Sequence, residues 1–391
     1  MNTHILHKDV QDFITQNLKS NLTQLILKGS PFEGVSIQEI ATQIVAKEKS
    51  QKKLPSWFQT KNIYYPPKLN LEQTSSEITA DYKASLVSGK RIVDVTGGFG
   101  VDSFAFSKHF DVVTHCELNP ELSAIAAYNF EQLSSNYVET YIGDGIEFIK
   151  NGATTYDCIY IDPSRRNDAK GKVFLLEDCA PNVPENLDGL FLKSNTILIK
   201  TSPMLDISSA VSELHSVKEI HAVAVLGDVK ELLFLLEKNF TGSISIKTIN
   251  FQKTAIQKFG FIYQSNVAST YGLPKKYLYE PNAAILKSGG FQQVSEALKL
   301  DKLHQHSHLY TADELVDFPG RTFEIIEVIN YDKKKIKSLL PNKKANITTR
   351  NFPKTVQQLR KELKIKDGGH DYLFFTTDLN NQFICIHSKK V

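Results

Sequence analysis

The sequence predicts an α/β protein: a doubly wound parallel sheet, with an N-terminal helical region before it and a small α+β domain after it. Between about residues 91 and 245, short apolar runs alternate with helix-like runs, the pattern of parallel strands joined by helices. The first 70 residues have helical spacing, and the tail returns to β-type alternation. With 391 residues, 41% hydrophobic and 23% charged, the chain can bury a large core and is not a disordered protein.

The N-terminal region, residues 1–70, has apolar side chains at helical intervals of three and four. These residues are Val10, Phe13, Ile14, Leu18 and Leu22. A second helical run spans residues 37–44, and the polar, proline-marked stretch 47–70 has the composition of a connector. We expect this region to form a helical cap on the domain that follows.

The central region supplies the strands and helices of the predicted sheet. We expect strands at RIVDVT, VVTHCE, VETYIG, YDCIYIDP and TILIKTSP, and helices at VDSFAFSKH, PELSAIAAYNFEQL, GIEFIKN and ISSAVSEL. The segment EIHAVAVL-GD-VKELLFLLEK predicts two strands joined by a Gly227-Asp228 turn, since Gly-Asp suits the centre of a hairpin. This hairpin would add an antiparallel strand at or near one edge of the sheet.

The tail combines one long strand, TFEIIEVINYD, with the helix KTVQQLRKELK and the β-pair DYLFFTTDL and QFICIHS. Residues 321–391 contain 15 Lys and Arg against 7 Asp and Glu, a net charge of +8, although the whole chain carries only +3. The basic charge is therefore concentrated in one small terminal domain, which favours an acidic partner for that domain.

Several classes of protein are disfavoured by what the sequence lacks. The four cysteines, Cys116, Cys158, Cys179 and Cys385, form no C-x-x-C pair, so neither a disulfide framework nor a zinc site is expected. The alternating His304, His306 and His308 have no neighbouring set of carboxylates or cysteines, and we expect a polar loop rather than a metal site. No signal peptide or long apolar run is apparent, so we expect a cytoplasmic protein without membrane contact.

Four predicted strands end in residues suited to a nucleotide-like ligand, and ligands of open α/β sheets bind at this edge. The first strand ends at Asp94, followed by Thr96, Gly97, Gly98 and Gly100. Glycines allow the backbone to approach a ligand, and the next helix directs its N–H groups toward it.

The next strand ends suit other parts of such a ligand. Glu117 lies 23 residues beyond Asp94, a spacing typical of an acid that binds ribose hydroxyls. Asp144 could accept a hydrogen bond from an exocyclic amine, or it could simply cap the following helix. The fourth strand ends in Asp162 and Pro163, followed by two arginines, which suit phosphate or substrate.

The segments VDVTGGFGVDS, CELNP, IGDGIEF and IDPSRR resemble motifs I to IV of the class I S-adenosyl-L-methionine-dependent methyltransferases, whose sheet is Rossmann-like. The resemblance implies cofactor contacts for the residues Asp94, Thr96, Gly97, Gly98, Gly100, Glu117 and Asp144. It also implies catalytic roles at the motif IV residues Asp162, Pro163, Arg165 and Arg166. Motif IV reads D-P-S-R, without the aromatic residue that stacks on a flipped base in many base-amine methyltransferases.

Further segments, EQTSSEITADYKASLV, YEPNAAILKSGG and TRNFP…LRKELKIKDGGHDYLF, are similar to a bacterial group with a ferredoxin-like segment and a THUMP-like C-terminal domain. The resemblance implies a methyltransferase domain at 71–245, a linker strand and ferredoxin-like segment at 246–320, and a basic THUMP-like domain at 321–391. Members of this group are described by inference as RNA methyltransferases.

We therefore expect methylation of a base nitrogen in RNA (rRNA or tRNA), with the tail holding phosphates. The candidate RNA-binding residues are Lys333, Lys334, Lys335, Lys343, Lys344, Arg350 and Arg360. Carbon-5 methylation of a pyrimidine needs a cysteine nucleophile, and the strand TILIKTSP ends in Thr201 and Ser202 instead.

The sequence leaves other functions open. The chain could methylate a small molecule or a protein, or it could bind RNA without turnover. An NAD-linked oxidoreductase fits less well, because the turn from Gly98 to Ser103 reads G-x-G-x-x-S rather than G-x-G-x-x-G. The oligomeric state is also open.

Overall fold

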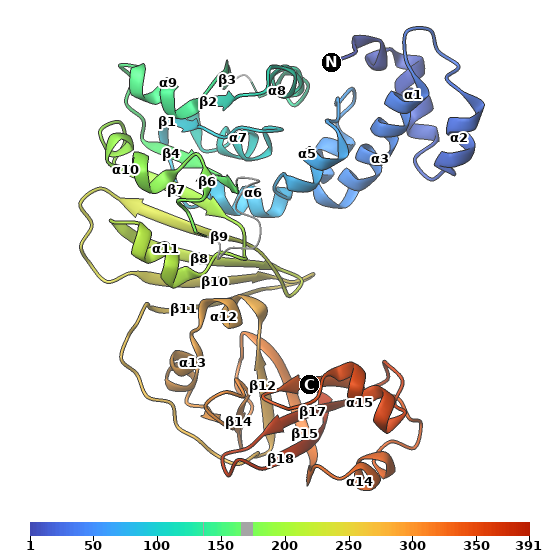
Figure 1. Cartoon of the computed structure of the whole chain (residues 1–391), viewed down its shortest axis with the longest axis vertical. Coiled ribbons are helices and arrows are strands. Elements are labelled where there is room, and N and C mark those ends of the chain that lie inside the picture. Colours follow the sequence, from blue (N-terminus) through green and yellow to red (C-terminus); the bar gives the residue numbers. More distant parts are fainter. Residues whose placement is uncertain (136, 166–174) are drawn as a thin grey trace. The chain divides into compact units, whose positions relative to one another are not determined.

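The computed structural model describes residues 1–135, 137–165 and 175–391. They form two compact units (Figure 1). The first contains Met1–Glu219 and Leu232–Gly242, and the second contains Ile220–Glu231 and Ser243–Val391. The strands β8 (Val217–Val225) and β9 (Asp228–Glu237) both cross the boundary. Most of β9 belongs to the first unit and most of β8 to the second.

The first unit begins with helices. These are η1 (Thr3–Leu6), α1 (Lys8–Gln16), α2 (Leu22–Lys28), α3 (Ile37–Lys53), α4 (Pro55–Gln59), α5 (Lys68–Gln73) and α6 (Glu77–Ala84). The stretch 47–70, predicted as a connector, is largely helical, because its Lys, Glu and Gln residues favour helix and extend α3 to Lys53. Pro55 then starts α4 at its first position, where a missing N–H costs nothing.

The helical region packs directly on the domain that follows. Trp57 is fully buried, and its ring lies 4.7 Å from that of Phe99 and 5.8 Å from that of Phe104. The side-chain amide of Asn129 accepts a hydrogen bond from the Tyr64 N–H and donates one to the Tyr64 carbonyl, both at 2.9 Å. The region therefore covers this domain, as the sequence predicts for a helical cap.

The rest of the first unit is the α/β domain. Its strands are β1 (Gly89–Asp94), β2 (Phe110–Glu117), β3 (Val138–Ile142), β4 (Cys158–Ile161), β5 (Ser164–Arg165), β6 (Cys179–Ala180) and β7 (Thr196–Thr201). Its helices are α7 (Val101–Phe106), α8 (Pro120–Gln132), α9 (Gly145–Asn151), α10 (Val183–Phe191) and α11 (Ile207–Glu213).

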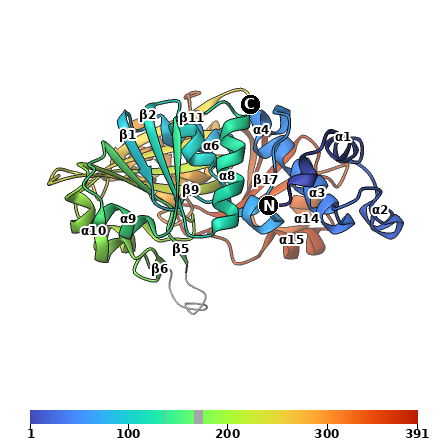
Figure 2. The same cartoon turned by 90° about the horizontal axis from the view of Figure 1, so that it is seen from above.

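The strands of the first unit have the order β9-β7-β4-β1-β2-β3 and are part of a nine-stranded sheet. The strands β7, β4, β1, β2 and β3 are parallel, and β9 pairs antiparallel with β7. Figure 2 shows α6 and α8 on one side of the strands and α9 and α10 on the other, so the sheet is doubly wound as predicted. The chain runs outward from β1 to β3 and then returns to β4, which creates a switch point between β1 and β4 where ligands bind in such folds.

The predicted hairpin is present, but its strands do not lie at the edge of the sheet, because β10 (Ser245–Phe251) and β11 (Ile256–Ile262) continue the order beyond β8. Its turn also lies one residue earlier than expected. Leu226 and Gly227, not Gly227 and Asp228, form the turn, with φ angles of 53° and 81°. Two consecutive positive φ angles are required by the turn that best matches the twist of a tight hairpin.

The second unit contains the strands β10 (Ser245–Phe251) and β11 (Ile256–Ile262), which pair antiparallel. Its other elements are β12 (Tyr277–Pro281), α12 (Ala283–Ser288), α13 (Phe291–Leu298), β13 (Asp301–Lys302), β14 (Tyr310–Ala312), β15 (Gly320–Asn330), α14 (Lys333–Ser338), β16 (Asn346–Arg350), α15 (Val356–Leu363), β17 (Asp371–Thr377) and β18 (Phe383–Lys390).

A seven-stranded sheet, in the order β13-β14-β12-β15-β18-β17-β16, forms the core of the second unit. The predicted β-pair of the tail is confirmed, since β17 and β18 are antiparallel neighbours. Ile336 of α14 and Leu359 of α15 pack with Phe375 of the sheet in one buried cluster. The amphipathic helix is also confirmed, and a capping box between Thr355 and Gln358 starts it.

Candidate active site

A cleft of about 700 Å³ lies at the carboxyl ends of the parallel strands of the first unit. It brings together most of the residues that the sequence predicts for the site, namely Thr96, Gly97, Gly98, Glu117, Asp144, Asp162, Pro163 and Arg165. Its volume is within the usual range for a cofactor pocket. Asp94 and Gly100 are not part of its wall, and Arg166 lies outside the described residues.

The three glycines of the turn after β1 have different roles. A Cβ on Gly97 would stand 2.3 Å from the imidazole of His115, and one on Gly100 would stand 2.4 Å from the ring of Phe130. These two glycines therefore allow close packing inside the domain. Gly98 has φ +57°, and the nearest atom to a Cβ there is a backbone oxygen at 3.8 Å, so its space opens into the cleft that it lines.

Asp94 lies beneath this turn and is only 1% exposed. Its Oδ2 accepts a hydrogen bond from the Ser103 hydroxyl at 2.7 Å, and its Oδ1 accepts one from the Thr96 N–H at 3.0 Å. Burial raises the pKa of this carboxyl to about 7, and the Ser103 hydrogen bond opposes the rise. In this structure Asp94 thus joins the turn to α7.

Glu117 and Asp144 lie on the wall of the cleft and also organise its backbone. Glu117 accepts hydrogen bonds from the Gly98 N–H at 2.9 Å and the Asn119 N–H at 2.8 Å. Asp144 caps α9 by accepting from the Ile146 N–H at 2.8 Å and the Glu147 N–H at 3.1 Å. A carboxylate has about four acceptor positions, so each can still accept a hydrogen bond from a ligand.

Asp162 forms an ion pair with Lys200, and both side chains lie on the wall of the cleft. The Lys200 ammonium is 2.6 Å from Asp162 Oδ2, and the Asp162 N–H donates to the Thr96 hydroxyl at 2.8 Å. Burial raises the pKa of the Asp162 carboxyl, and the Lys200 ammonium opposes the rise. Lys200 was not predicted, although a lysine in the otherwise apolar run TILIK is an available signal.

A second ion pair, between Lys83 and Asp102, was also not predicted. Lys83 is completely buried in α6, and its ammonium lies 3.2 Å from Asp102 Oδ1. Asp102 Oδ2 accepts hydrogen bonds from the hydroxyls of Ser75 at 2.8 Å and Tyr160 at 2.9 Å. Ser75 and Lys83 belong to the segment EQTSSEITADYKASLV, but only the folded chain brings them to Asp102.

Motif IV continues from Asp162 into the short strand β5. Arg165 pairs there with Cys179 of β6, and both Arg165 and Pro163 line the cleft. Cys179 is buried, in agreement with a structural role. Thr201 and Ser202 follow β7, and Ser202 lines the cleft.

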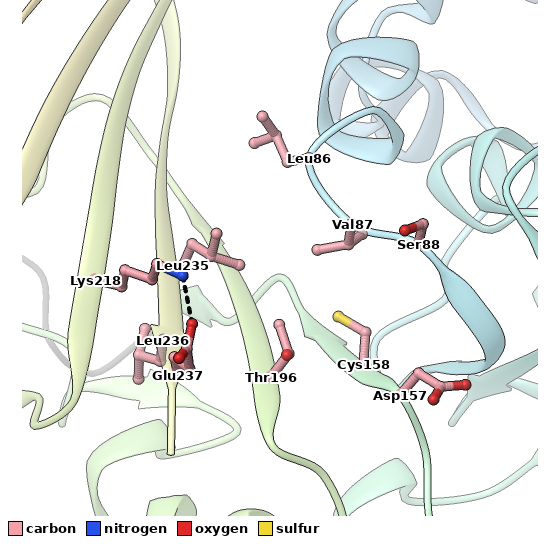
Figure 3. Close-up of a pocket in the computed structure, with 10 residues that line it drawn as sticks. All are labelled: Leu86, Val87, Ser88, Asp157, Cys158, Thr196, Lys218, Leu235, Leu236 and Glu237. Carbon is pink, nitrogen blue, oxygen red and sulfur yellow. Dashed lines mark hydrogen bonds and ion pairs between the residues drawn. The ribbon is translucent and has the colours of Figure 1, made fainter. Parts of the chain in front are cut away.

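A smaller cavity of about 220 Å³ lies at the amino ends of the parallel strands, opposite the cleft (Figure 3). It is lined by Cys158 and Thr196, the first residues of β4 and β7, and by the ion pair between Lys218 and Glu237. Because ligands of open α/β sheets bind at the carboxyl ends of the strands, we assign the site to the larger cleft.

The predicted RNA-binding residues of the tail fall into two groups. Lys333, Arg350 and Arg360 form ion pairs with Glu362, Glu280 and Asp367, respectively. The other group consists of Lys334, Lys335, Lys343 and Lys344, which are exposed and form no ion pair with the described residues.

The histidine loop forms polar and aromatic contacts. His304 contacts the side chains of Asn381 at 3.1 Å and Asn351 at 3.0 Å. His308 stacks on Phe291 with 3.6 Å between ring centroids, and burial lowers its pKa to about 4. Among residues 1–135, 137–165 and 175–391, no group of three or more His, Cys, Asp or Glu side chains could hold a metal ion.

None of the described helices combines the length and apolar character needed to cross a membrane. Two family models match the second unit: a ferredoxin-like domain at residues 277–319 and a THUMP domain-like model at residues 320–390. A search of curated proteins gave no match.

Solved structures also resemble the chain. A protein of Porphyromonas gingivalis W83, named a "putative methyltransferase", is 31% identical, with a TM-score of 0.88 over 100% of this chain and 98% of that one. Partial overlaps include TrmK of M. capricolum in complex with S-adenosyl-homocysteine (18% identity, TM-score 0.32, 41% of this chain and 68% of that one). An rRNA methylase of Streptococcus thermophilus overlaps similarly (14% identity, TM-score 0.30, 41% and 94%).

The full-length match and the two domain models agree with the sheet order and with the motifs at its edge. The chain belongs to the class I methyltransferase group that has a ferredoxin-like segment and a C-terminal THUMP-like domain.

Proposed function

We propose that this chain is an S-adenosyl-L-methionine-dependent methyltransferase that modifies a base nitrogen of RNA, in rRNA or tRNA. The observation that carries the proposal is one cleft in which an open glycine turn meets Glu117, Asp144 and Asp162, at the ends of successive parallel strands. This combination provides a backbone cradle, two acceptors for a nucleoside and a carboxylate at the point where a substrate would react.

The residues of the cleft fit this cofactor. Glu117 would accept from the ribose hydroxyls and Asp144 from the adenine amine, since each retains free acceptor positions. Leu118, 69% exposed, and Ile146 line the same part of the cleft and offer apolar contact to the adenine ring. Gly98 would let the ligand approach the backbone, because its missing side chain leaves open space.

When bound, the cofactor supplies an electrophilic methyl group. The task of the protein is then to orient the nucleophile and to accept its proton. The Asp162 carboxylate is held by Lys200 at 2.6 Å and lines the cleft. It can accept a hydrogen bond from an amino or imino N–H of a base, which aligns the nitrogen lone pair. Arg165 lies nearby on the same wall and would bind a phosphate of the reacting nucleotide.

RNA as the substrate is supported by the second unit. Its THUMP-like region carries the net charge of +8 on residues 321–391. The exposed lysines Lys334, Lys335, Lys343 and Lys344 have no ion-pair partner among the described residues. Free ammonium groups of this kind bind backbone phosphates and release counterions.

The test is transfer of a tritiated methyl group from S-adenosyl-L-methionine to total RNA and, separately, to total protein and a small-molecule extract. We expect label in RNA with the wild-type chain and a loss of about 100-fold or more with Asp162→Asn, the usual scale for losing a proton acceptor. The matched control is Asp188→Asn, at an exposed carboxylate of α10, which should retain activity.

The other outcomes of the transfer experiment would each support a different function. Label in protein or in the small-molecule extract alone would replace RNA by that substrate. RNA binding without transfer to any fraction would instead indicate a non-catalytic RNA-binding protein.

A further inference from the structure

The acid at the end of β1 has no free access to a ligand in this structure. Asp94 is 1% exposed, is absent from the wall of the cleft, and accepts hydrogen bonds from Ser103 and Thr96 through its two oxygens. A carboxylate that is almost fully buried and does not reach the wall of the cleft supports the turn rather than a ligand. A ligand with a positively charged amino group therefore needs a different carboxylate.

Asp102 offers that carboxylate. It is the second residue of α7, directly after the glycine turn, and it lines the cleft with 13% of its side chain exposed. Ser75, Tyr160 and Lys83 all contact its two oxygens. These three residues come from the segment before α6, from β4 and from α6, so the position of the carboxylate is set from three directions.

The location of Asp102 matches one end of the proposed cofactor. Glu117 ends β2, and Asp144 follows β3. In the strand order β4-β1-β2-β3, β1 separates β4 from the strands that carry Glu117 and Asp144. Tyr160 of β4 donates to Asp102, which places Asp102 on the β4 side. A nucleoside bound over β2 and β3 would therefore extend its amino-acid portion toward Asp102.

Resting on the proposed function, we propose that Asp102 binds the α-ammonium group of the amino-acid portion of S-adenosyl-L-methionine. A carboxylate and an ammonium form a charge-assisted hydrogen bond, stronger than a neutral one. Gln73 and Thr74 line the neighbouring part of the cleft and supply amide and hydroxyl donors for the carboxylate of the same amino-acid portion. Lys83 keeps a positive charge behind Asp102, on the side away from solvent.

The test uses calorimetric titration of the full chain with two ligands. S-adenosyl-homocysteine contains the amino-acid portion, and 5′-methylthioadenosine contains the same nucleoside without it. We expect Asp102→Asn to weaken binding of S-adenosyl-homocysteine about 10- to 100-fold, the scale of a hydrogen bond to a charged group, and to leave binding of 5′-methylthioadenosine unchanged. Asp94→Asn is the matched control, and it should weaken both ligands alike because it loosens the turn that both contact.

A third ligand makes the test specific to the ammonium group. The analogue of S-adenosyl-homocysteine without its amino group should bind the wild-type chain as weakly as S-adenosyl-homocysteine binds Asp102→Asn. It should lose nothing further in that variant. If Asp102→Asn does not fold, Ser75→Ala, which removes one donor to Asp102, should show the same selectivity to a smaller degree.

Two results would overturn the inference while leaving the proposed function intact: equal weakening of S-adenosyl-homocysteine and 5′-methylthioadenosine by Asp102→Asn, or no weakening of either. Absence of binding of every adenosyl ligand to the wild-type chain would instead refute the proposed function, and the inference with it.

Discussion

The cleft of the first unit and the THUMP-like region of the second both contain many charges, but they use them differently. Lys200, on the wall of the cleft, and Lys83, behind Asp102, are largely removed from solvent, and each meets one aspartate. In the THUMP-like region, Lys333 and Lys354 share Glu362 at the surface. Buried pairs fix the orientation of a side chain, whereas exposed pairs add little stability.

The largest effect is expected for the buried cation. Lys83→Met keeps the length of the side chain but leaves the Asp102 carboxylate, 13% exposed, without its fully buried ammonium partner; breaking a buried ion pair typically costs about 3–5 kcal/mol. Lys333→Met, the surface counterpart, should leave stability unchanged, because Lys354 still faces Glu362. Urea denaturation of both variants measures the difference, and equal midpoints would remove the distinction between the two regions.

The glycine turn provides the next test. Gly97→Ala places a Cβ 2.3 Å from His115 and should destabilise the fold by about 1–3 kcal/mol, as overpacking does. Gly98→Ala meets no atom closer than 3.8 Å, so its cost should be about 1 kcal/mol, from the positive φ alone. Thermal denaturation compares the two variants; a larger loss for Gly98→Ala would contradict the packing described for this turn.

The raised pKa of Asp94 predicts that the stability of the first unit depends on pH, in a way that the THUMP-like region does not share. Burial raises the pKa of this carboxyl to about 7 from an ordinary value of 3.8. Between these values the folded chain holds a proton that the unfolded chain has lost. The stability due to this proton is complete below about pH 4 and is lost as the pH rises to about 7, by up to about 1.4 kcal/mol per pH unit.

The control for this prediction is Asp94→Asn, which cannot titrate. Its stability relative to the wild type should rise from pH 5.5 to about 7 and then stay constant, as measured by urea denaturation across that range. A difference between the two chains that does not change with pH would show that Asp94 is ionised in the fold throughout.

The smallest effect concerns the exposed lysines. Changing both Lys334 and Lys335 to Gln should lower RNA affinity several-fold at low salt and reduce the slope of log K against log salt by about 1.4, the value for two contacts with a single strand. Lys333→Gln should change the slope less, because Lys333 is paired with Glu362. Fluorescence anisotropy at several salt concentrations measures these slopes; equal slopes for all chains would exclude this surface as an RNA contact.

Local pattern was sufficient to predict the sheet and the strand-end residues of the cleft. Asp94, Glu117 and Asp162 each occupy the end of an apolar run or follow it directly, and parallel strands bring such ends to one edge. The burial of Asp94 could not be predicted, because it depends on Ser103 and on the helix that covers it.

Contacts between distant segments could not be predicted either, because they also depend on how the chain folds. Lys83 and Asp102 come from different helices, and Arg350 is 70 residues from Glu280, its ion-pair partner. Composition counts every charge as free, so it overestimated the number of basic groups available in the tail. The polar end of α3 has the composition of a connector, because exposed helix faces and connectors contain similar residues.

Calorimetric titration of the full chain with S-adenosyl-L-methionine, S-adenosyl-homocysteine and NAD shows whether the cleft binds the proposed cofactor. We predict saturable one-site binding of both adenosyl ligands and none of NAD. Glu117→Ala should weaken both adenosyl ligands about tenfold or more, because it removes an acceptor for a ribose that they share. Binding of NAD without binding of either adenosyl ligand would exclude S-adenosyl-L-methionine as the cofactor of this cleft.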